Sequence, residues 1–256
     1  MQSLSHDRLA GALVSEAGRF GTTIASGDPD APVPTCPEWT VRDLTCHVGL
    51  AYHKSAAIIA SRPTGYVPFE AVTVDDPPAF DALGGWLVDG AERLVAAVAD
   101  VGPETPTSTW TPDRRAGFWT RRLTHETVVH RADAAFATGT PYDVDADLAA
   151  DGISEGLWLA AVFARRPHPA LDRSSLRGTG ETLLFRATEP EVGWLVRRLP
   201  SGVEVSDDAA EADVVVEGRA ADLLLALTGR LTADDPRLTV SGDAALFHHW
   251  RENTRF

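Results

Sequence analysis

Two side chains that commonly bind metals, Glu126 and His130, lie four residues apart in this sequence. In an α-helix such a pair shares one face, whereas His125 and His130, five residues apart, diverge by about 140°. The segment is therefore not the zinc-protease motif, which needs two histidines four residues apart and would require histidine where Val129 stands. An imidazole and a carboxylate on one face are good zinc ligands, but they are also a common surface pair.

His47 is the third candidate ligand. It lies three residues after Leu44 and four before Ala51, and hence on or beside the apolar stripe of a helix. An unpaired buried imidazole would cost about 1–3 kcal/mol, so His47 needs a polar partner. Either a backbone carbonyl supplies that partner, or His47 faces Glu126 and His130 across a bundle. The second arrangement would be a three-ligand metal site with a coordination position open for water, thiol or substrate.

The elements that would position these side chains are helices. Apolar residues recur every three or four positions, which predicts helices at about 9–24, 40–58, 80–99, 120–138 and 147–164. Thr40 and Asp43 have the spacing of a capping box, and Gly139 suits the end of the fourth helix. Long helices joined by turns and by one longer loop favour an antiparallel bundle of four or five helices.

The pattern changes after the segment Arg165-Arg166-Pro167-His168-Pro169. Short runs rich in β-branched or aromatic residues predict strands at 182–185, 192–197, 203–205, 214–216 and 238–240, with helices at 220–227 and 243–250. Such an order is typical of a small α+β domain. We therefore expect a helical bundle at residues 1–168 and an α+β domain at 169–256.

The composition excludes some classes of protein. The formal net charge of −14 would repel phosphate backbones and anionic lipid headgroups, so neither nucleic acid nor a membrane is expected as a partner. Charged residues interrupt the first twenty positions, which argues against an export signal. Two cysteines, Cys36 and Cys46, are too few for a disulfide framework. A cytoplasmic location with reduced thiols is expected.

Two separated motifs resemble those of a known family. Residues 33–44, Val-Pro-Thr-Cys-Pro-Glu-Trp-Thr-Val-Arg-Asp-Leu, are followed by His47-Val48-Gly49, and residues 124–134 form the second motif. Both resemble the signatures of the mycothiol-dependent maleylpyruvate isomerase family, which belongs to the DinB-like superfamily of metal-binding helical bundles. Residues 212–218, 222–227, 229–230 and 240–243 are similar to the sterol-carrier-like domain of these proteins. The sequence departs from the family at Glu38, where many relatives have glycine, and at Cys46.

The resemblance implies a site and a chemistry. By motif, the family's metal ligands fall on His47, Glu126 and His130, with zinc as the expected divalent metal. Mycothiol is the implied thiol cosubstrate, and a small electrophile is the implied substrate of an isomerase or thiol S-transferase. Arg230 is a candidate to bind an anionic substrate or the thiol. Arg131 and Arg121 are weaker candidates, and each of the three could instead be a solvated surface charge.

Two other classes of function stay open. A metal-dependent hydrolase could use the same ligands to activate water, with Asp133 or His125 as its acid–base group. A specialised biosynthetic enzyme of the same fold is a related alternative. A non-enzymatic protein could use the α+β domain to bind a lipid or small ligand. Dependence of activity on added thiol separates the thiol enzyme from the hydrolase, and ligand retention without turnover indicates the binder.

Overall fold

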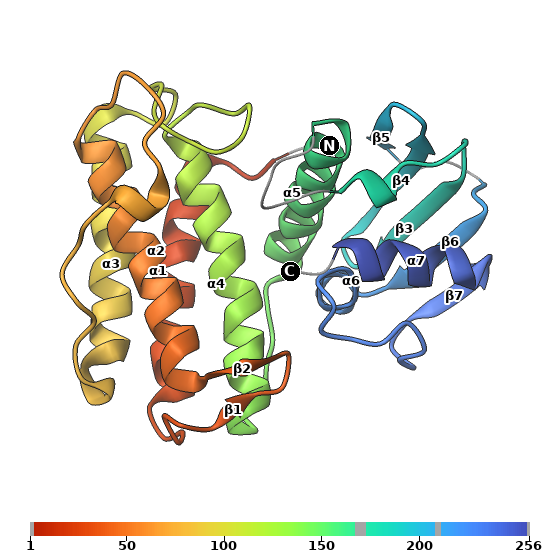
Figure 1. Ribbon diagram of the computed structural model, residues 1–256. Helices are drawn as coiled ribbons and strands as arrows, with labels where there is room; N and C mark the ends of the chain where they lie inside the picture. The colour runs from red at the N-terminus through yellow and green to blue at the C-terminus, as the bar shows by residue number, and fades with distance from the viewer. Residues whose placement is uncertain (1–2, 167–172, 208–210, 255–256) are drawn as a thin grey trace. The chain divides into compact units, whose positions relative to one another are not determined.

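The computed structural model describes residues 3–166, 173–207 and 211–254. Its contacts divide the chain into two compact units, and Figure 1 shows the elements of each. The first unit comprises Ser5–Tyr142, and the second comprises Asp143–Phe256 together with Met1–Leu4. No helix in the described part of the chain is both long and apolar enough to span a membrane.

The unit Ser5–Tyr142 is a four-helix bundle. Its helices are α1 (His6–Ile24), α2 (Val41–Ala60), α3 (Phe80–Val101) and α4 (Gly117–Thr138). Both α1 and α2 pack against α3 and against α4, so the four helices surround one core (Figure 1). The apolar stripe expected on the first helix is buried throughout, at Leu9, Leu13, Ala17, Phe20 and Ile24. The predicted helical periodicity is confirmed.

Helix α4 buries more polar side chains than the other helices of the bundle. The buried polar residues of α4 are Thr120, Arg122, Thr124, His125, Thr127, His130, Arg131 and Asp133. One of them, Arg131, donates through Nε to Oε2 of Glu16 on α1 at 2.7 Å, and both side chains are 4% exposed. Buried charges of this kind require partners, so α4 brings a polar network into the bundle.

A short hairpin leads into α2. It consists of β1 (Pro32–Val33) and β2 (Cys36–Thr40), paired antiparallel. Thr40 then caps α2: its hydroxyl accepts from the Asp43 amide, and the Asp43 carboxylate accepts from the Thr40 amide. The predicted capping box is therefore confirmed. Gly139 ends α4 at φ 67°, the left-handed conformation that glycine adopts without strain.

The second unit is built on a five-stranded sheet. Its strands are β3 (Thr182–Thr188), β4 (Glu191–Leu199), β5 (Gly202–Asp207), β6 (Val214–Gly218) and β7 (Thr239–Gly242), in the order β5-β4-β3-β6-β7. Only the β3–β6 pair is parallel among these neighbours. Helices α6 (Ala220–Leu227) and α7 (Ala244–Thr254) pack on β6. Phe185 of the sheet lies 6.1 Å from Phe247 and 6.3 Å from Trp250 of α7, ring centre to ring centre. The predicted α+β architecture is confirmed.

Helix α5 (Ala146–Arg165) lies in the second unit, although the sequence pattern placed it in the bundle. It packs against α6 and β5, and Trp194 of β4 donates through Nε1 to Ser154 Oγ of α5 at 2.8 Å. The boundary between the two units therefore lies between Tyr142 and Asp143 rather than at residues 168–169. Periodicity reveals that a helix has an apolar face, but it does not reveal which core that face covers. His168 lies outside the described residues.

Candidate metal centre

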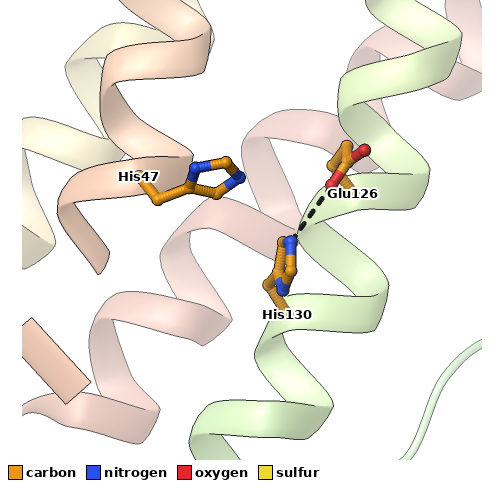
Figure 2. Close-up of side chains that lie close together, drawn as sticks. All are labelled: His47, Glu126 and His130. Carbon is orange, nitrogen blue, oxygen red and sulfur yellow. Dashed lines mark ion pairs between the residues drawn. The ribbon is translucent and has the colours of Figure 1, made fainter. Parts of the chain in front are cut away.

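Three side chains from two helices of the bundle converge on one point. His47 extends from α2, and Glu126 and His130 extend from successive turns of α4 (Figure 2). One ligand atom from each lies within 4.8 Å of those of the other two. His47 is exposed, Glu126 is half-buried and His130 is buried. His47 therefore lies beside the apolar stripe of α2 rather than on it, and the cluster has a face toward solvent.

Glu126 is held between a guanidinium and an imidazole. Arg122, one turn earlier on α4, donates to Glu126 Oε1 through Nε at 3.1 Å and through Nη2 at 2.8 Å. The other oxygen, Oε2, lies 3.1 Å from His130 Nε2. Burial alone would raise the pKa of Glu126, but Arg122 and His130 outweigh it and hold that pKa well below its usual range. Glu126 is thus a carboxylate at neutral pH, with one oxygen directed at the histidines.

His130 contacts a carboxylate on each side of its ring. Besides Glu126 at Nε2, Asp133 Oδ2 lies 2.9 Å from His130 Nδ1. Burial would lower the pKa of His130, but the hydrogen bonds to Asp133 and Glu126 prevail and raise it. Asp133 has no exposed side-chain surface, and its Oδ1 accepts a hydrogen bond from the Thr35 hydroxyl at 2.5 Å. The imidazole is therefore fixed in orientation by protein groups at both nitrogens.

His47 is the ligand candidate at the solvent side. Its ring centre lies 4.8 Å from that of Trp39 and 5.4 Å from that of His130, with the two imidazoles nearly perpendicular at 85°. Desolvation and the neighbouring His130 lower the pKa of His47, and the weaker attraction of Glu126 does not reverse this. The imidazole is consequently neutral near pH 7, which is the form that donates a lone pair to a metal.

The donor set fits a borderline divalent metal. Two imidazole nitrogens and one carboxylate oxygen are typical of a zinc site that keeps a coordination position open. Zinc bonds of about 2.0–2.2 Å in a tetrahedral site place neighbouring donors about 3.3–3.6 Å apart. The observed limit of 4.8 Å is therefore within reach of small side-chain rotations. The three donor atoms therefore suit zinc in chemical type and in spacing. Each of them can also be unprotonated when the metal binds, as a metal ligand must be.

The other residues singled out from the sequence do not join this cluster. His125 is 2% exposed and is not a member of the group, as its helical spacing predicts. Arg131 is engaged with Glu16, and its guanidinium carbon lies 4.6 Å from the centre of the Tyr142 ring. It is therefore a buried structural charge rather than a solvated one or a free anion-binding group. Arg121 is half-buried on α4.

Arg230 and the two cysteines also lie outside the cluster. Arg230 belongs to the second unit, where its Nη1 donates to the Thr228 carbonyl at 2.6 Å just after α6. Cys46 precedes His47 and is half-buried, and desolvation raises the pKa of its thiol. A raised pKa keeps a thiol protonated and unreactive at neutral pH. Cys36 is half-buried in β2.

Three residues that complete the surroundings of the site were not identified from the sequence: Arg122, Thr35 and Trp39. Arg122 stands four residues before Glu126, so the helical i,i+4 spacing could have revealed that pair. Thr35 binds a residue 98 positions away, and no periodicity connects the two. Trp39 likewise meets His47 only because the hairpin folds against α2.

The fold and the site define a class: a four-helix bundle with a cluster of two histidines and one glutamate, joined in one chain to an α+β unit. Comparison with known families agrees with this class. The family model described as "Mycothiol maleylpyruvate isomerase N-terminal domain" matches residues 10–135. A second, "MDMPI C-terminal domain", matches residues 147–249. The chain belongs to the mycothiol maleylpyruvate isomerase family.

Solved structures support the assignment at the level of fold. A crystal structure of the mycothiol-dependent maleylpyruvate isomerase matches with a TM-score of 0.60 and 16% identity, covering 94% of this chain and 96% of that one. The structure of a histidine-to-alanine mutant of the isomerase matches with a TM-score of 0.61 and 15% identity over the same shares. At such identities the similarity shows a common fold. No curated protein sequence matches the chain significantly.

Proposed function

We propose that the chain is a metal-dependent enzyme that uses mycothiol to isomerise a small electrophilic substrate, or to transfer the thiol to it. The observation that carries this proposal is the cluster of His47, Glu126 and His130, whose ligand atoms lie within 4.8 Å of one another. The cluster falls within the residues matched by the family's N-terminal model. Family membership supports mycothiol as the thiol, since the residues alone do not specify it.

His47, Glu126 and His130 would hold the divalent metal, with zinc as the proposed ion. Bound there, the ion would lower the pKa of a coordinated thiol from its free value of about 8.5 and favour the nucleophilic thiolate. The chain's own groups prepare the ligands. Arg122 fixes Oε1 of Glu126 and leaves Oε2 toward the imidazoles. Exposed His47 marks the side from which solvent, thiol and substrate can approach.

The proposed chemistry of the substrate follows from a thiolate nucleophile. Addition of sulfur to one carbon of an activated cis double bond converts that bond to a single bond, and the electron pair moves into the adjacent carbonyl. Rotation about the single bond and expulsion of the thiolate regenerate the double bond in the trans form, with no net consumption of thiol. If the adduct instead takes up a proton and is released, the outcome is S-transfer.

Arg230 remains the residue proposed to bind an anionic substrate or the thiol. Its guanidinium is half-buried and held by the Thr228 carbonyl, which limits its freedom to rotate. A partly ordered guanidinium is well suited to bind a carboxylate through two parallel hydrogen bonds. Because Arg230 and the ligands belong to different units, we expect catalysis to need both units, whereas the unit Ser5–Tyr142 should suffice for metal binding.

The alternatives receive less support. Asp133 and His125, the acid–base groups that a hydrolase would use, have 0% and 2% exposure and cannot reach a substrate in solution. The second unit contains a cavity of about 470 Å³ whose lining includes Trp194, Asp147, Asp151 and Asp207. Three carboxylates in its lining disfavour a lipid, because an apolar chain bound there would withdraw these charges from water: Asp151 is buried, and Asp147 and Asp207 are exposed.

The experiment that tests the proposal combines metal analysis with a thiol-dependence assay. Purified protein should retain zinc after dialysis, and the loaded protein should isomerise maleylpyruvate only when mycothiol is added. Arg230→Lys keeps the charge but loses the planar fork, so its KM for an anionic substrate should rise while zinc content is unchanged. Turnover with water alone, in the absence of any thiol, would exclude the thiol mechanism and favour a hydrolase.

A further inference from the structure

Asp133 is a fully buried carboxylate that does not belong to the ligand cluster but contacts it. It lies one turn after His130 on α4 and has no exposed side-chain surface. Oδ2 lies 2.9 Å from His130 Nδ1, and Oδ1 accepts the Thr35 hydroxyl at 2.5 Å. Withdrawing a carboxylate from water costs several kcal/mol unless its oxygens are hydrogen-bonded, so its interior position requires these partners.

The contact with Asp133 determines which nitrogen of His130 is available. A carboxylate can only accept hydrogen bonds, so Nδ1 must carry the proton that lies between His130 and Asp133. The other nitrogen, Nε2, is the atom that faces Glu126 Oε2 at 3.1 Å and lies in the cluster with His47. When Nε2 gives its lone pair to a metal, Nδ1 keeps the proton that it shares with Asp133, so Asp133 favours the neutral tautomer that binds a metal through Nε2.

Thr35 extends this arrangement to the hairpin. It lies in the turn between β1 and β2 and directly follows Pro34, whose ring restricts the backbone, while Val33, two residues earlier, is completely buried. Its hydroxyl donates to Asp133 Oδ1, which limits rotation of the carboxyl group about its own axis. A fixed carboxyl group in turn fixes the plane of the His130 ring, because the Nδ1–H bond is directional.

We propose that Thr35 and Asp133 are positioning residues that orient His130 as a metal ligand, through the hydrogen-bonded series Thr35 hydroxyl, Asp133 carboxylate and His130 imidazole. The proposal rests on the metal site proposed above and adds the two residues that prepare it. Neither residue touches the metal or the substrate. Histidines that bind metals usually donate their second N–H to a carboxylate or carbonyl, and losing that partner weakens metal binding about 10- to 100-fold.

A purely structural role for Asp133 makes a different prediction. If the carboxylate served only to hold the hairpin on α4, its removal would lower stability and leave zinc affinity unchanged. The bundle offers a matched control in Glu16, another buried carboxylate, which binds α4 through Arg131 rather than through a residue of the ligand cluster. Glu16→Gln should therefore lower stability without changing zinc affinity.

The test measures zinc affinity by competition with a chromophoric chelator in the full chain. Asp133→Asn keeps the shape of the side chain but loses its charge, and zinc should bind about 10- to 100-fold more weakly. Thr35→Val removes only the hydroxyl donor, and the loss should be smaller, roughly 3- to 10-fold. In ¹⁵N-labelled wild-type protein, the His130 Nδ1–H should give a slowly exchanging imidazole signal, and Asp133→Asn should lose it.

The outcomes separate this inference from the proposed function. Zinc affinity in Asp133→Asn equal to that of the wild type, or a wild-type His130 protonated at Nε2 with zinc bound, would overturn the positioning role while the metal site stands. If Asp133→Asn does not fold, the affinity of Thr35→Val and the wild-type imidazole signal decide the question. If wild-type protein binds no zinc, the metal site fails and the positioning role fails with it.

Discussion

Replacing His47 with alanine should remove most of the stabilisation that zinc gives the bundle, with little effect on the metal-free protein. His47 is exposed on α2, so its loss leaves no buried cavity. Its lowered pKa makes it neutral near pH 7, so no ion pair is broken. Surface substitutions of this type usually change the free energy of unfolding by no more than about 0.5 kcal/mol.

The zinc-dependent part is larger and can be calculated. A ligand that binds only the folded state stabilises it by RT ln(1 + [L]/Kd), which is about 2.7 kcal/mol when free zinc is 100 times Kd. Suppose that loss of one of the three ligands weakens zinc binding about 100-fold. The same concentration of free zinc then equals the Kd of the variant, and the stabilisation by zinc falls to about 0.4 kcal/mol. The expected difference is therefore about 2 kcal/mol, well above experimental error in a denaturation curve.

Urea denaturation with and without buffered zinc, followed by tryptophan fluorescence, measures this difference. His125→Ala is the control, because His125 adjoins Glu126 in sequence but is buried and lies outside the cluster. His125→Ala should destabilise the metal-free protein, because it leaves a buried cavity, but zinc should still raise its free energy of unfolding by the full amount. If zinc still stabilises His47→Ala fully but no longer stabilises His125→Ala, the assignment of ligands to helix faces is wrong.

Two further predictions concern the helix that carries His47. Thr40→Ala removes the capping hydroxyl of α2 and should cost about 1 kcal/mol at pH 7. The hydrogen bonds from Thr40 lower the pKa of Asp43 below its usual 3.8, so their contribution is complete above that pH and is lost as the pH falls through the lowered value. Thr40→Ala also removes the hydrogen bond from the Thr40 hydroxyl to the Asp43 carboxylate, so in urea denaturation the difference from wild type should be smaller at pH 3 than at pH 7. An equal difference at both pH values would show that this hydroxyl–carboxylate bond does not contribute to stability. Gly49→Ala should cost about 1–3 kcal/mol, because a Cβ there would lie 2.1 Å from Cζ3 of Trp86 on α3. Gly11→Ala, whose Cβ would meet nothing within 4 Å, is its control and should raise stability by about 0.4–1 kcal/mol; equal thermal stability of the two variants would show that the close packing at Gly49 is unimportant.

The sequence by itself determined the features that depend on local backbone geometry. The capping box of Thr40 and Asp43 and the left-handed end of α4 at Gly139 follow from residue types at fixed spacings, and both are confirmed. The shared face of Glu126 and His130, four residues apart, follows from the pitch of a helix, and Glu126 Oε2 lies 3.1 Å from His130 Nε2. The family resemblance, carried by two separated motifs, is also confirmed.

The tertiary structure decided which faces meet. His47 joins the cluster from another helix, and Thr35 reaches Asp133 from a hairpin 98 residues away in sequence. Helix α5 has the same kind of apolar stripe as the bundle helices, yet it covers the sheet of the second unit. Hydrophobic burial is non-directional and depends mainly on area, so an apolar stripe is compatible with more than one partner. Complementary packing and the satisfaction of buried polar groups select among those partners, and both depend on side chains that are distant in the sequence.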